Sequence, residues 1–319
     1  MTRQAPTHLA GARPEAGTDQ RQGTSAPPRR ARDDRRVAWL FLLPVLVGFV
    51  VFYAYPTIRG VWYSFTDYSL LDEPAYVGGD NYRQLVGDAQ FWNALKVTGY
   101  YVVVNIVSQT VVALGLAALM HRLTRSVLLR ATLLVPWLVP NVTIGLLWAW
   151  LLDPDLGYVN HLIGLTGLDT TLSFNSPDWA MPLVALVNSW TFTGYTALLL
   201  YAGMLQIPPH LYEGAAIDGA GEWRMFRSIT LPLLRPILAL VLVVSLIGSF
   251  QIFDTVAVVY GGKAPIPETR VIYYYIFQRA FTYFDMGYAS AVAMVLVVIL
   301  GVLTTLQLRM LRASSSDLG

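Results

Sequence analysis

Polar side chains are spread through long apolar stretches of this sequence, and their types limit the chemistry open to them. Polar and ionisable groups inside such stretches are costly to bury and often functional. The candidates are Asn105, Ser108, Gln109, Asn141, Thr143, Asn188, Ser189, Thr191, Ser245, Ser249, Gln251 and Asp254. Their carboxamides, hydroxyls and one carboxylate can hydrogen-bond a polar solute, although serine and threonine can equally bond a backbone carbonyl of a neighbouring turn.

Other kinds of chemistry find little support in the residues. The chain has no cysteine, which excludes disulfides, thiolate metal sites and cysteine nucleophiles. The dipeptide Gly262-Lys263 lacks the rest of a nucleotide-binding phosphate loop. The histidines are scattered and form no metal-binding or general-base pattern. They are His8, His121, His161 and His210. We predict no catalytic residue, no metal and no cofactor on this chain, and a net charge of +2 makes no case for nucleic acid.

The elements that must position these polar groups are membrane spans. The chain is 55% hydrophobic and 13% charged, whereas a soluble domain is about 25% charged. A helix needs about 20 apolar residues to cross the hydrocarbon core. Six segments qualify, and they run over Val37 to Ile58, Ala94 to Met120, Val127 to Leu152, Trp179 to Leu205, Leu231 to Tyr260 and Tyr288 to Leu308. We predict an all-α membrane protein with six transmembrane helices.

Charge and composition predict the organisation of the chain around these spans. Residues 1–36 are rich in Pro, Gly, Gln and Arg and are expected to form a disordered tail. A transmembrane domain follows over 37–312, and 313–319 form a C-terminal tail. Arginines concentrate before the first span, after the second and fourth, and at the chain's end, so both termini are expected in the cytoplasm. Because no internal repeat is visible, a second subunit is expected to complete any path through the membrane.

The connection over 207–232 is the most informative segment. Pro208 and Pro209 stop the incoming helix and suit the start of a new one. Glu213 lies early in that helix, where its charge complements the dipole, and Gly219 allows a turn. A second short helix, about Glu222 to Ile229, is expected to end before Pro232. Small residues would let a partner protein approach this helix–turn–helix closely, although an ordinary surface connection has the same features.

This segment resembles the EAA loop of ABC importer permeases. The family pattern is Glu-Ala-Ala, three residues, Gly, and then about ten residues to Ile-x-Leu-Pro. It is matched by Glu213, Ala215, Gly219, Ile229, Leu231 and Pro232, with Gly214 in place of the first alanine. The strings Phe250-Gln-Ile-Phe-Asp-Thr-Val256 and Tyr273-Tyr-Tyr-Ile-Phe-Gln-Arg-Ala-Phe281 are similar to the carbohydrate-uptake, maltose-permease-like branch. The resemblance implies the type I ABC importer permease (MetI-like) fold.

The resemblance also implies partners and a location. In this family a helix of the loop docks on a separate ABC ATPase dimer, which binds ATP and Mg, and an extracytoplasmic solute-binding protein delivers the solute. A second, related permease completes the path, within the lipid of a bacterial cell membrane. The residues expected to couple to the ATPase are Tyr212, Glu213, Ala215, Ala216, Asp218 and Gly219.

Alignment with maltose-type permeases implies where the solute contacts the spans. The expected contacts are Trp137, Asn141, Asn188, Ser249, Phe250 and Gln251. Asp254, toward the end of its span, is expected to be a structural ion-pair or gate residue rather than a ligand. An ABC permease for glycerol phosphate, a polyol or another non-sugar solute remains the alternative, ahead of a secondary transporter or a membrane enzyme.

Overall fold

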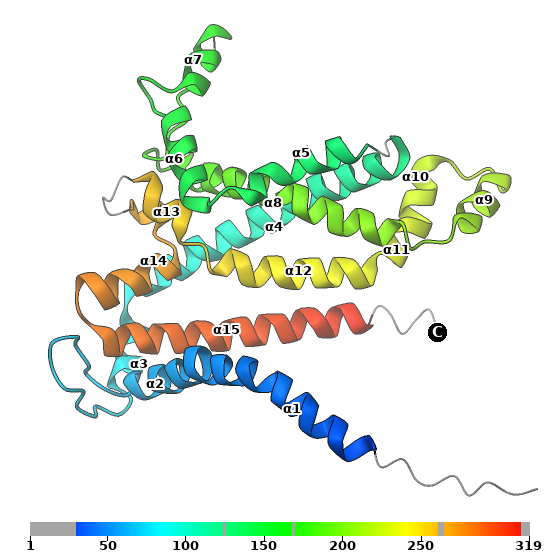
Figure 1. Ribbon diagram of the computed structural model, residues 1–319. Coiled ribbons are helices and arrows are strands. Elements are labelled where there is room, and N and C mark those ends of the chain that lie inside the picture. Colours follow the sequence, from blue (N-terminus) through cyan, green and yellow to red (C-terminus); the bar gives the residue numbers. More distant parts are fainter. Residues whose placement is uncertain (1–29, 124–125, 168–169, 261–264, 314–319) are drawn as a thin grey trace, which may run out of the picture. The chain divides into compact units, whose positions relative to one another are not determined.

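The protein is described by a computed structural model over residues 30–123, 126–167, 170–260 and 265–313. These residues form helices joined by turns, with one isolated bridge between Thr66 and Tyr76 (Figure 1). The chain divides into two compact units, Met1–Pro56 and Thr57–Gly319. The predicted all-α architecture is therefore present in the described residues.

The first unit contains helix α1 (Arg30–Phe49), the π-helical turn η1 (Val50–Ala54) and the start of α2 (Tyr55–Tyr63). Residues 39–63 are long and apolar enough to cross a membrane. The helix begins at Arg30, so residues 30–36, which we assigned to a disordered tail, are helical. A helix seeded by an apolar stretch extends readily through arginine, a good helix former. Residues 1–29 of the expected tail lie outside the described residues.

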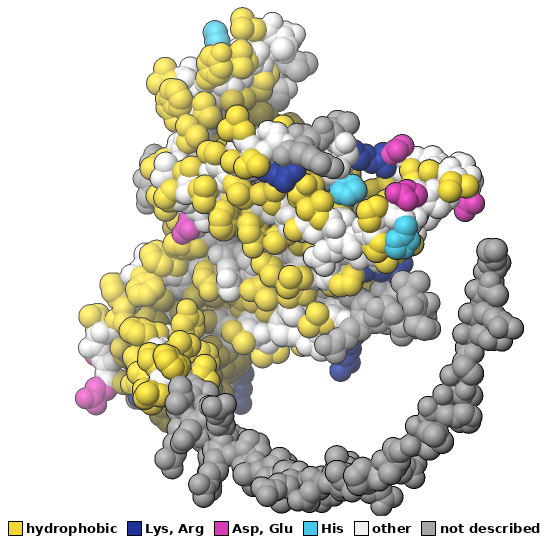
Figure 2. Space-filling view, turned by 45° about the vertical axis from the view of Figure 1, so that its right-hand side comes forward, with side chains coloured by type: hydrophobic (Ala, Val, Ile, Leu, Met, Phe, Trp, Pro, Cys, Tyr) yellow, Lys and Arg dark blue, Asp and Glu magenta, His cyan; other side chains and the backbone are white. Residues whose placement is uncertain are grey.

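The second unit is built on four long helices and the short α3 (Asp80–Gly87). The long helices are α4 (Ala89–Leu123), α8 (Ala180–Met204), α12 (Arg235–Phe250) and α15 (Met286–Ala313). Each contributes a stretch of the length and hydropathy of a membrane span. Hydrophobic side chains cover much of the visible surface in Figure 2, as expected for helices that face lipid. The C-terminal tail that we placed at 313–319 lies outside the described residues except for Ala313, which ends α15.

The third span, predicted as one helix over Val127–Leu152, is broken. It forms α5 (Val127–Leu138) and α6 (Asn141–Leu151), which meet at 90°. Pro140 precedes α6, and a proline disfavours helical backbone at the residue before it, here Val139, which is extended. The correction matters because the break exposes the first residue of α6, Asn141, beside other spans.

The fifth span is also interrupted, although we predicted it as continuous over Leu231–Tyr260. Helix α12 ends at Phe250, and α13 (Asp254–Val259) begins after three non-helical residues. The two breaks are neighbours, because α13 packs on α6. Gly145 of α6 faces Thr255 and Val258 of α13, and a Cβ atom at Gly145 would lie 3.6 Å from each.

Short elements connect the spans at their two ends. At one end, hereafter the α9 end, α8 leads into α9 (Pro209–Ile217), α10 (Glu222–Met225), the π-helical turn η2 (Phe226–Thr230) and α11 (Leu231–Leu233). At the other, the α14 end, lie α7 (Tyr158–Leu165), η3 (Pro267–Thr269), α14 (Ile272–Phe277) and η4 (Gln278–Thr282). The expected end of the second loop helix before Pro232 is wrong. Pro232 lies in the first turn of α11, where its missing amide is not needed.

Candidate functional site

The loop over 207–232 folds as the predicted helix–turn–helix. Helix α9 starts at Pro209 and ends in a Schellman motif, in which Gly219 N–H bonds Ala216 O at 3.1 Å and Ala220 N–H bonds Ala215 O at 2.9 Å. Gly219 has φ +74°, a left-handed conformation that residues other than glycine adopt at a cost. The turn that separates α9 from α10 therefore depends on the glycine.

Two contacts hold this loop to the spans. The Tyr212 hydroxyl shares a hydrogen bond of 2.9 Å with Thr230 of η2, and its ring lies 6.1 Å from that of His121 on α4. Arg122, the next residue of α4, forms an ion pair with Glu222 at the start of α10. These contacts connect α9 to η2 and α10 to the end of α4.

The structure sorts the residues that we expected to couple to an ATPase. Tyr212 is half-buried and serves as the anchor just described, and Ala215 is also half-buried. The exposed ones are Glu213, Ala216, Asp218 and Gly219. The sequence reasoning missed Ile217, which is 87% exposed at the last turn of α9. The sequence signal for this residue was an isoleucine directly after the small residues of the loop. The structure adds that α9 has no buried position.

A cavity of about 410 Å³ lies among the spans of the second unit. Its walls come from α4, α8, α12, the α5–α6 break and the α12–α13 break. The polar and aromatic lining residues are Tyr101, Asn105, Gln109, Trp137, Asn141, Asn188, Phe192, Tyr195, Thr196, Ser245, Ser249, Gln251, Phe253, Asp254 and Thr255. Both broken spans thus meet at one polar hollow, as discontinuous membrane helices do where backbone lines a cavity.

Some of these polar groups are already engaged with one another. Asn105 donates to Ser249 Oγ at 3.0 Å and accepts from Ser189 at 3.0 Å. Gln109 donates to Thr196 Oγ1 at 2.7 Å. These side chains are buried and tie α4 to α8 and α12. Ser249, one of our expected solute contacts, lines the cavity but belongs to this interhelical network.

A second group of polar side chains keeps bonding capacity toward the cavity. Asn141 and Asp254 begin α6 and α13, and Asn141 Nδ2 donates to Asp254 Oδ2 over a long 3.5 Å. Gln251 is exposed in the α12–α13 break, and Asn188 of α8 lies beside the buried hydroxyl of Tyr101. Asp254 has no ion-pair partner among the described residues, and its expected role as a structural ion-pair or gate residue stays a prediction.

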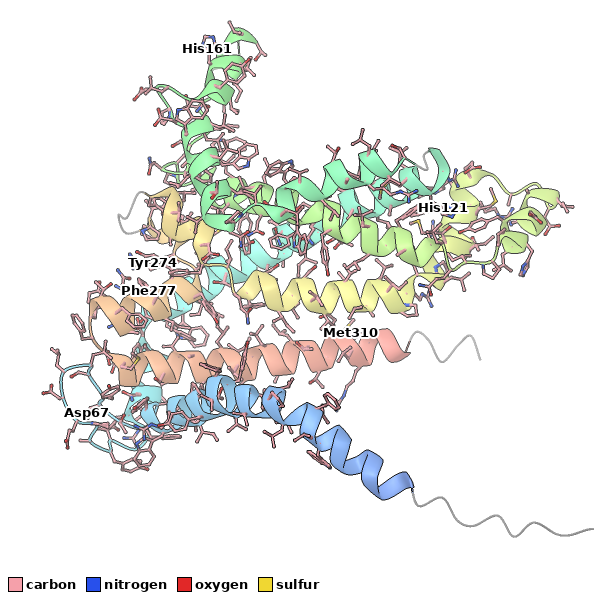
Figure 3. All side chains as sticks on the ribbon, in the orientation of Figure 1. Asp67, His121, His161, Tyr274, Phe277 and Met310 are labelled. Carbon is pink, nitrogen blue, oxygen red and sulfur yellow. The ribbon has the colours of Figure 1, made fainter. Side chains whose placement is uncertain are left out.

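Aromatic rings flank the same hollow. Trp137 stacks on Tyr195 with ring centroids 4.8 Å apart and planes 13° from parallel. The pair meets because Gly194 lets α5 approach α8 so closely that a Cβ atom there would overlap Leu133 O. Phe253 packs against Phe277 of α14, which lies beside Tyr274 in Figure 3. Phe250, an expected solute contact, instead points into the hydrophobic core with 5% of its surface exposed, and it does not line the cavity.

A further polar cluster at the α14 end was not found from the sequence. Asp88 Oδ1 accepts from the backbone of Gln90 at 2.8 Å and so caps α4. Asp88 Oδ2 accepts from Tyr275, from Tyr288 at 2.7 Å and from Arg279 at 3.2 Å. Asp88 is separated from the other members by 187 to 200 positions in the chain, so no local signature joins them.

The ionisation of this cluster follows from its contacts. Burial alone would raise the pKa of Asp88, but the hydrogen bonds from Tyr275 and Tyr288 and from the backbone of α4 outweigh it and lower that pKa. Burial and the hydrogen bond to Asp88 raise the pKa of Tyr275 to about 12, so its hydroxyl remains a donor at neutral pH. The cluster joins the starts of α4 and α15 to α14.

No group of three or more potential metal ligands occurs among the described residues. Figure 3 shows His121 near α10 and His161 on α7, far apart on the second unit. His8 lies outside the described residues.

Comparison with known proteins places this geometry in context. Residues 109–314 match the family model for the binding-protein-dependent transport system inner membrane component. The chain is 34% identical over 282 residues to the sulfoquinovosyl glycerol transport system permease protein SmoG of Agrobacterium fabrum, covering 88% of this chain and 91% of that one. It is 30% identical to the trehalose/maltose transport system permease protein MalF of Thermococcus litoralis, over 80% and 85% of the two chains.

A solved structure shares the fold. A chain of a bacterial ABC transporter involved in the import of the acidic polysaccharide alginate superposes with a TM-score of 0.78 at 25% identity, covering 88% of this chain and 98% of that chain. This likeness confirms the predicted fold class.

Proposed function

Because the chain belongs to the family of binding-protein-dependent transport system inner membrane components, we propose that its cavity is one half of the solute path of an ATP-driven sugar or oligosaccharide importer. The chain is a permease, and the chemistry of ATP hydrolysis belongs to a separate subunit in this family. The related permeases for trehalose/maltose and sulfoquinovosyl glycerol support a carbohydrate solute.

The observation that carries the proposal is the juxtaposition of hydrogen-bonding side chains and a stacked aromatic pair in one cavity. Asn141, Asn188 and Gln251 offer amides that can both donate and accept. The exposed part of Trp137 offers an apolar ring for the C–H face of a sugar. A volume of about 410 Å³ falls within the range of about 300–1,000 Å³ for small-molecule sites. We assign the solute contacts to these four residues, with Ser249 as a support and Phe250 outside the site.

We further propose that α9 docks on the ATPase. Its exposed side presents Glu213, Ala216, Ile217 and Asp218, which combine a slim backbone with two acids and one apolar side chain. The Arg122–Glu222 ion pair and the Tyr212–Thr230 bond link this surface to α4 and η2. These links supply a physical route from nucleotide binding, with ATP and Mg on the partner dimer, to the spans around the cavity.

The remaining partners follow from the same assignment. The α9 end faces the cytoplasm in this proposal, with both termini, and the α14 end faces the binding protein. A second permease covers the open side of the cavity and completes the path. The arginine-rich connections at the α9 end support this orientation.

The test is transport by the assembled system. The chain, its co-encoded permease, ATPase and binding protein would be reconstituted in liposomes, and a panel of sugars screened for stimulated ATP hydrolysis and uptake. We expect one sugar to stimulate hydrolysis, Asn188→Ala to lower that stimulation at least about 10-fold, and basal hydrolysis to persist. Asn175→Ala, exposed and outside the cavity, is the matched control and should transport normally.

The coupling half of the proposal has its own variants. Glu213→Lys and Gly219→Pro should uncouple uptake from hydrolysis while the protein remains in the membrane, because one reverses a docking charge and the other removes the left-handed turn. Normal uptake by both variants would refute the docking role of α9. Stimulation by a phosphorylated polyol and by no sugar would replace the solute class but keep the architecture.

A further inference from the structure

The proposed function leaves the charge of the solute open. Family membership does not decide it, since the relatives described above include one named for trehalose/maltose and one involved in importing an acidic polysaccharide. The cavity itself is informative. Asp254 is the one acidic side chain among the described residues that line it, and those residues include no lysine or arginine.

We infer that Asp254 is a specificity-determining residue, which makes the cavity accept an uncharged, hydroxyl-rich solute and disfavour an anionic one. The inference rests on the proposed function, because it assigns a charge preference to the same cavity. It differs from our expectation from the sequence, in which Asp254 was a structural ion-pair or gate residue rather than a ligand.

The bonding state of Asp254 is the first argument. Its side chain is exposed to the cavity and accepts one hydrogen bond, from Asn141 at 3.5 Å, among the described residues. A carboxylate has about four lone-pair sites, so most of its accepting capacity is unused. Sugar hydroxyls are donors that can occupy these sites, whereas a carboxylate or phosphate of the solute brings no donor and adds like-charge repulsion.

The rest of the lining supports the same preference. An anionic solute is normally held by arginine or lysine, which supply charge-assisted hydrogen bonds. Here the available groups are the amides of Asn141, Asn188 and Gln251, which are neutral. They can bond a hydroxyl as donor or acceptor, but they cannot offset the charge of an anion held near Asp254.

A purely structural role for Asp254 has less support. The backbone across the α12–α13 break is held by its own bonds, from Gln251 N–H to Gly248 O at 3.2 Å and from Ala257 N–H to Phe253 O at 2.8 Å. The printed hydrogen bond of the Asp254 side chain within the described residues comes from Asn141 of α6 and not from α13. The backbone bonds across the break therefore do not involve the Asp254 side chain, whose local contribution is its charge in the first turn of α13.

The test measures binding to the permease itself. The complete permease–ATPase complex would be placed in lipid nanodiscs without the binding protein, so that the selectivity of that protein does not enter. Equilibrium dialysis would compare maltose, trehalose, cellobiose and lactose, each beside its uronic acid. We expect the tightest neutral disaccharide to bind wild type at least about 10-fold more tightly than its acid. Asp254→Asn should reduce this ratio below about 3-fold, mainly through tighter binding of the acid.

Controls separate this inference from the proposed function. Asp155→Asn removes an exposed acid outside the cavity and should leave the ratio unchanged, whereas Asn141→Asp should widen it. An unchanged ratio in Asp254→Asn, with neutral binding still abolished by Asn188→Ala, would overturn the inference and leave the proposed function standing. Tighter binding of an acid than of any neutral sugar to wild type would also overturn it.

Two further outcomes count against the inference. Loss of the partner permease on purification of Asp254→Asn would show that the carboxylate pairs across the subunit interface, as a structural group. Failure of wild type to bind any disaccharide or acid would remove the cavity as the solute site, and the proposed function with it.

Discussion

Asp88 and Asp254 are two carboxylates at helix starts in the same unit, and they are held in opposite ways. Asp88 accepts five hydrogen bonds, from the backbone of Gln90 and Phe91 and from Tyr275, Tyr288 and Arg279. Within the described residues, Asp254 accepts one, at 3.5 Å. A buried polar group without partners costs about 1–3 kcal/mol, so the five bonds to the largely buried Asp88 carboxylate stabilise the contacts between its helices. The exposed Asp254 carboxylate has one bond and keeps accepting capacity for a ligand. The number of partners thus separates scaffold from site.

The largest expected effect comes from removing the charge of Asp88. Asp88→Asn keeps an oxygen to cap α4, but an amide nitrogen at the other position cannot accept from the tyrosines or Arg279. Since the Arg279–Asp88 pair is largely buried, with side chains 21% and 11% exposed, we expect a loss of about 2–3 kcal/mol. That loss would lower the melting midpoint of the purified complex in detergent by about 5 °C.

The matched control for this substitution is Asp80→Asn. Asp80 also begins a helix and pairs with an arginine, Arg83, but both side chains are mostly exposed, at 65% and 85%. Exposed pairs contribute little, so the midpoint should hardly move. Equal shifts in the two variants would show that the cluster around Asp88 has no special role.

Lowering the pH should have an intermediate effect on the stability that Asp88 provides. The folded-state pKa of Asp88 lies below its usual value, so the unfolded chain binds a proton at a higher pH than the folded one. The stabilisation is therefore complete above the unfolded pKa, about 3.9, and is lost as pH falls through the folded pKa. Melting curves from pH 7 to pH 3 should show wild type and Asp88→Asn converging below about pH 4. A constant difference over that range would contradict the assignment.

The sequence predicts the elements of this molecule better than the contacts between them. Apolar length located the spans, and Pro208, Pro209 and Gly219 located the turns of the loop, because these signals are local. Pro140 gave the same local signal that a helix stops before a proline. We nevertheless predicted one continuous span there, because the apolar run is uninterrupted, and the structure has a 90° break. No local rule could bring Asp88 to Tyr275, which is 187 positions away.

The candidate site shows the same division. Asn141, Asn188 and Gln251, which the family resemblance implied as solute contacts, line the cavity, and their solute contacts stay a prediction. Phe250 and Gln251 are adjacent, and only the end of α12 between them decides that one enters the core and the other the cavity. The roles that we propose for Ile217 and Asp254 rest on exposure and on the few partners that the described residues offer them, which sequence does not display.

The smallest expected effect is the sharpest test of the comparison. Asp254→Asn should change the unfolding free energy by less than about 0.5 kcal/mol, because it removes one long hydrogen bond from an exposed side chain and asparagine can still bond Asn141. The melting midpoint of the complex, measured beside Asp88→Asn in the same detergent, would establish this. A destabilisation as large as that of Asp88→Asn would show that Asp254 has a structural role. The number of hydrogen-bond partners would then not distinguish a ligand-binding carboxylate from a structural one.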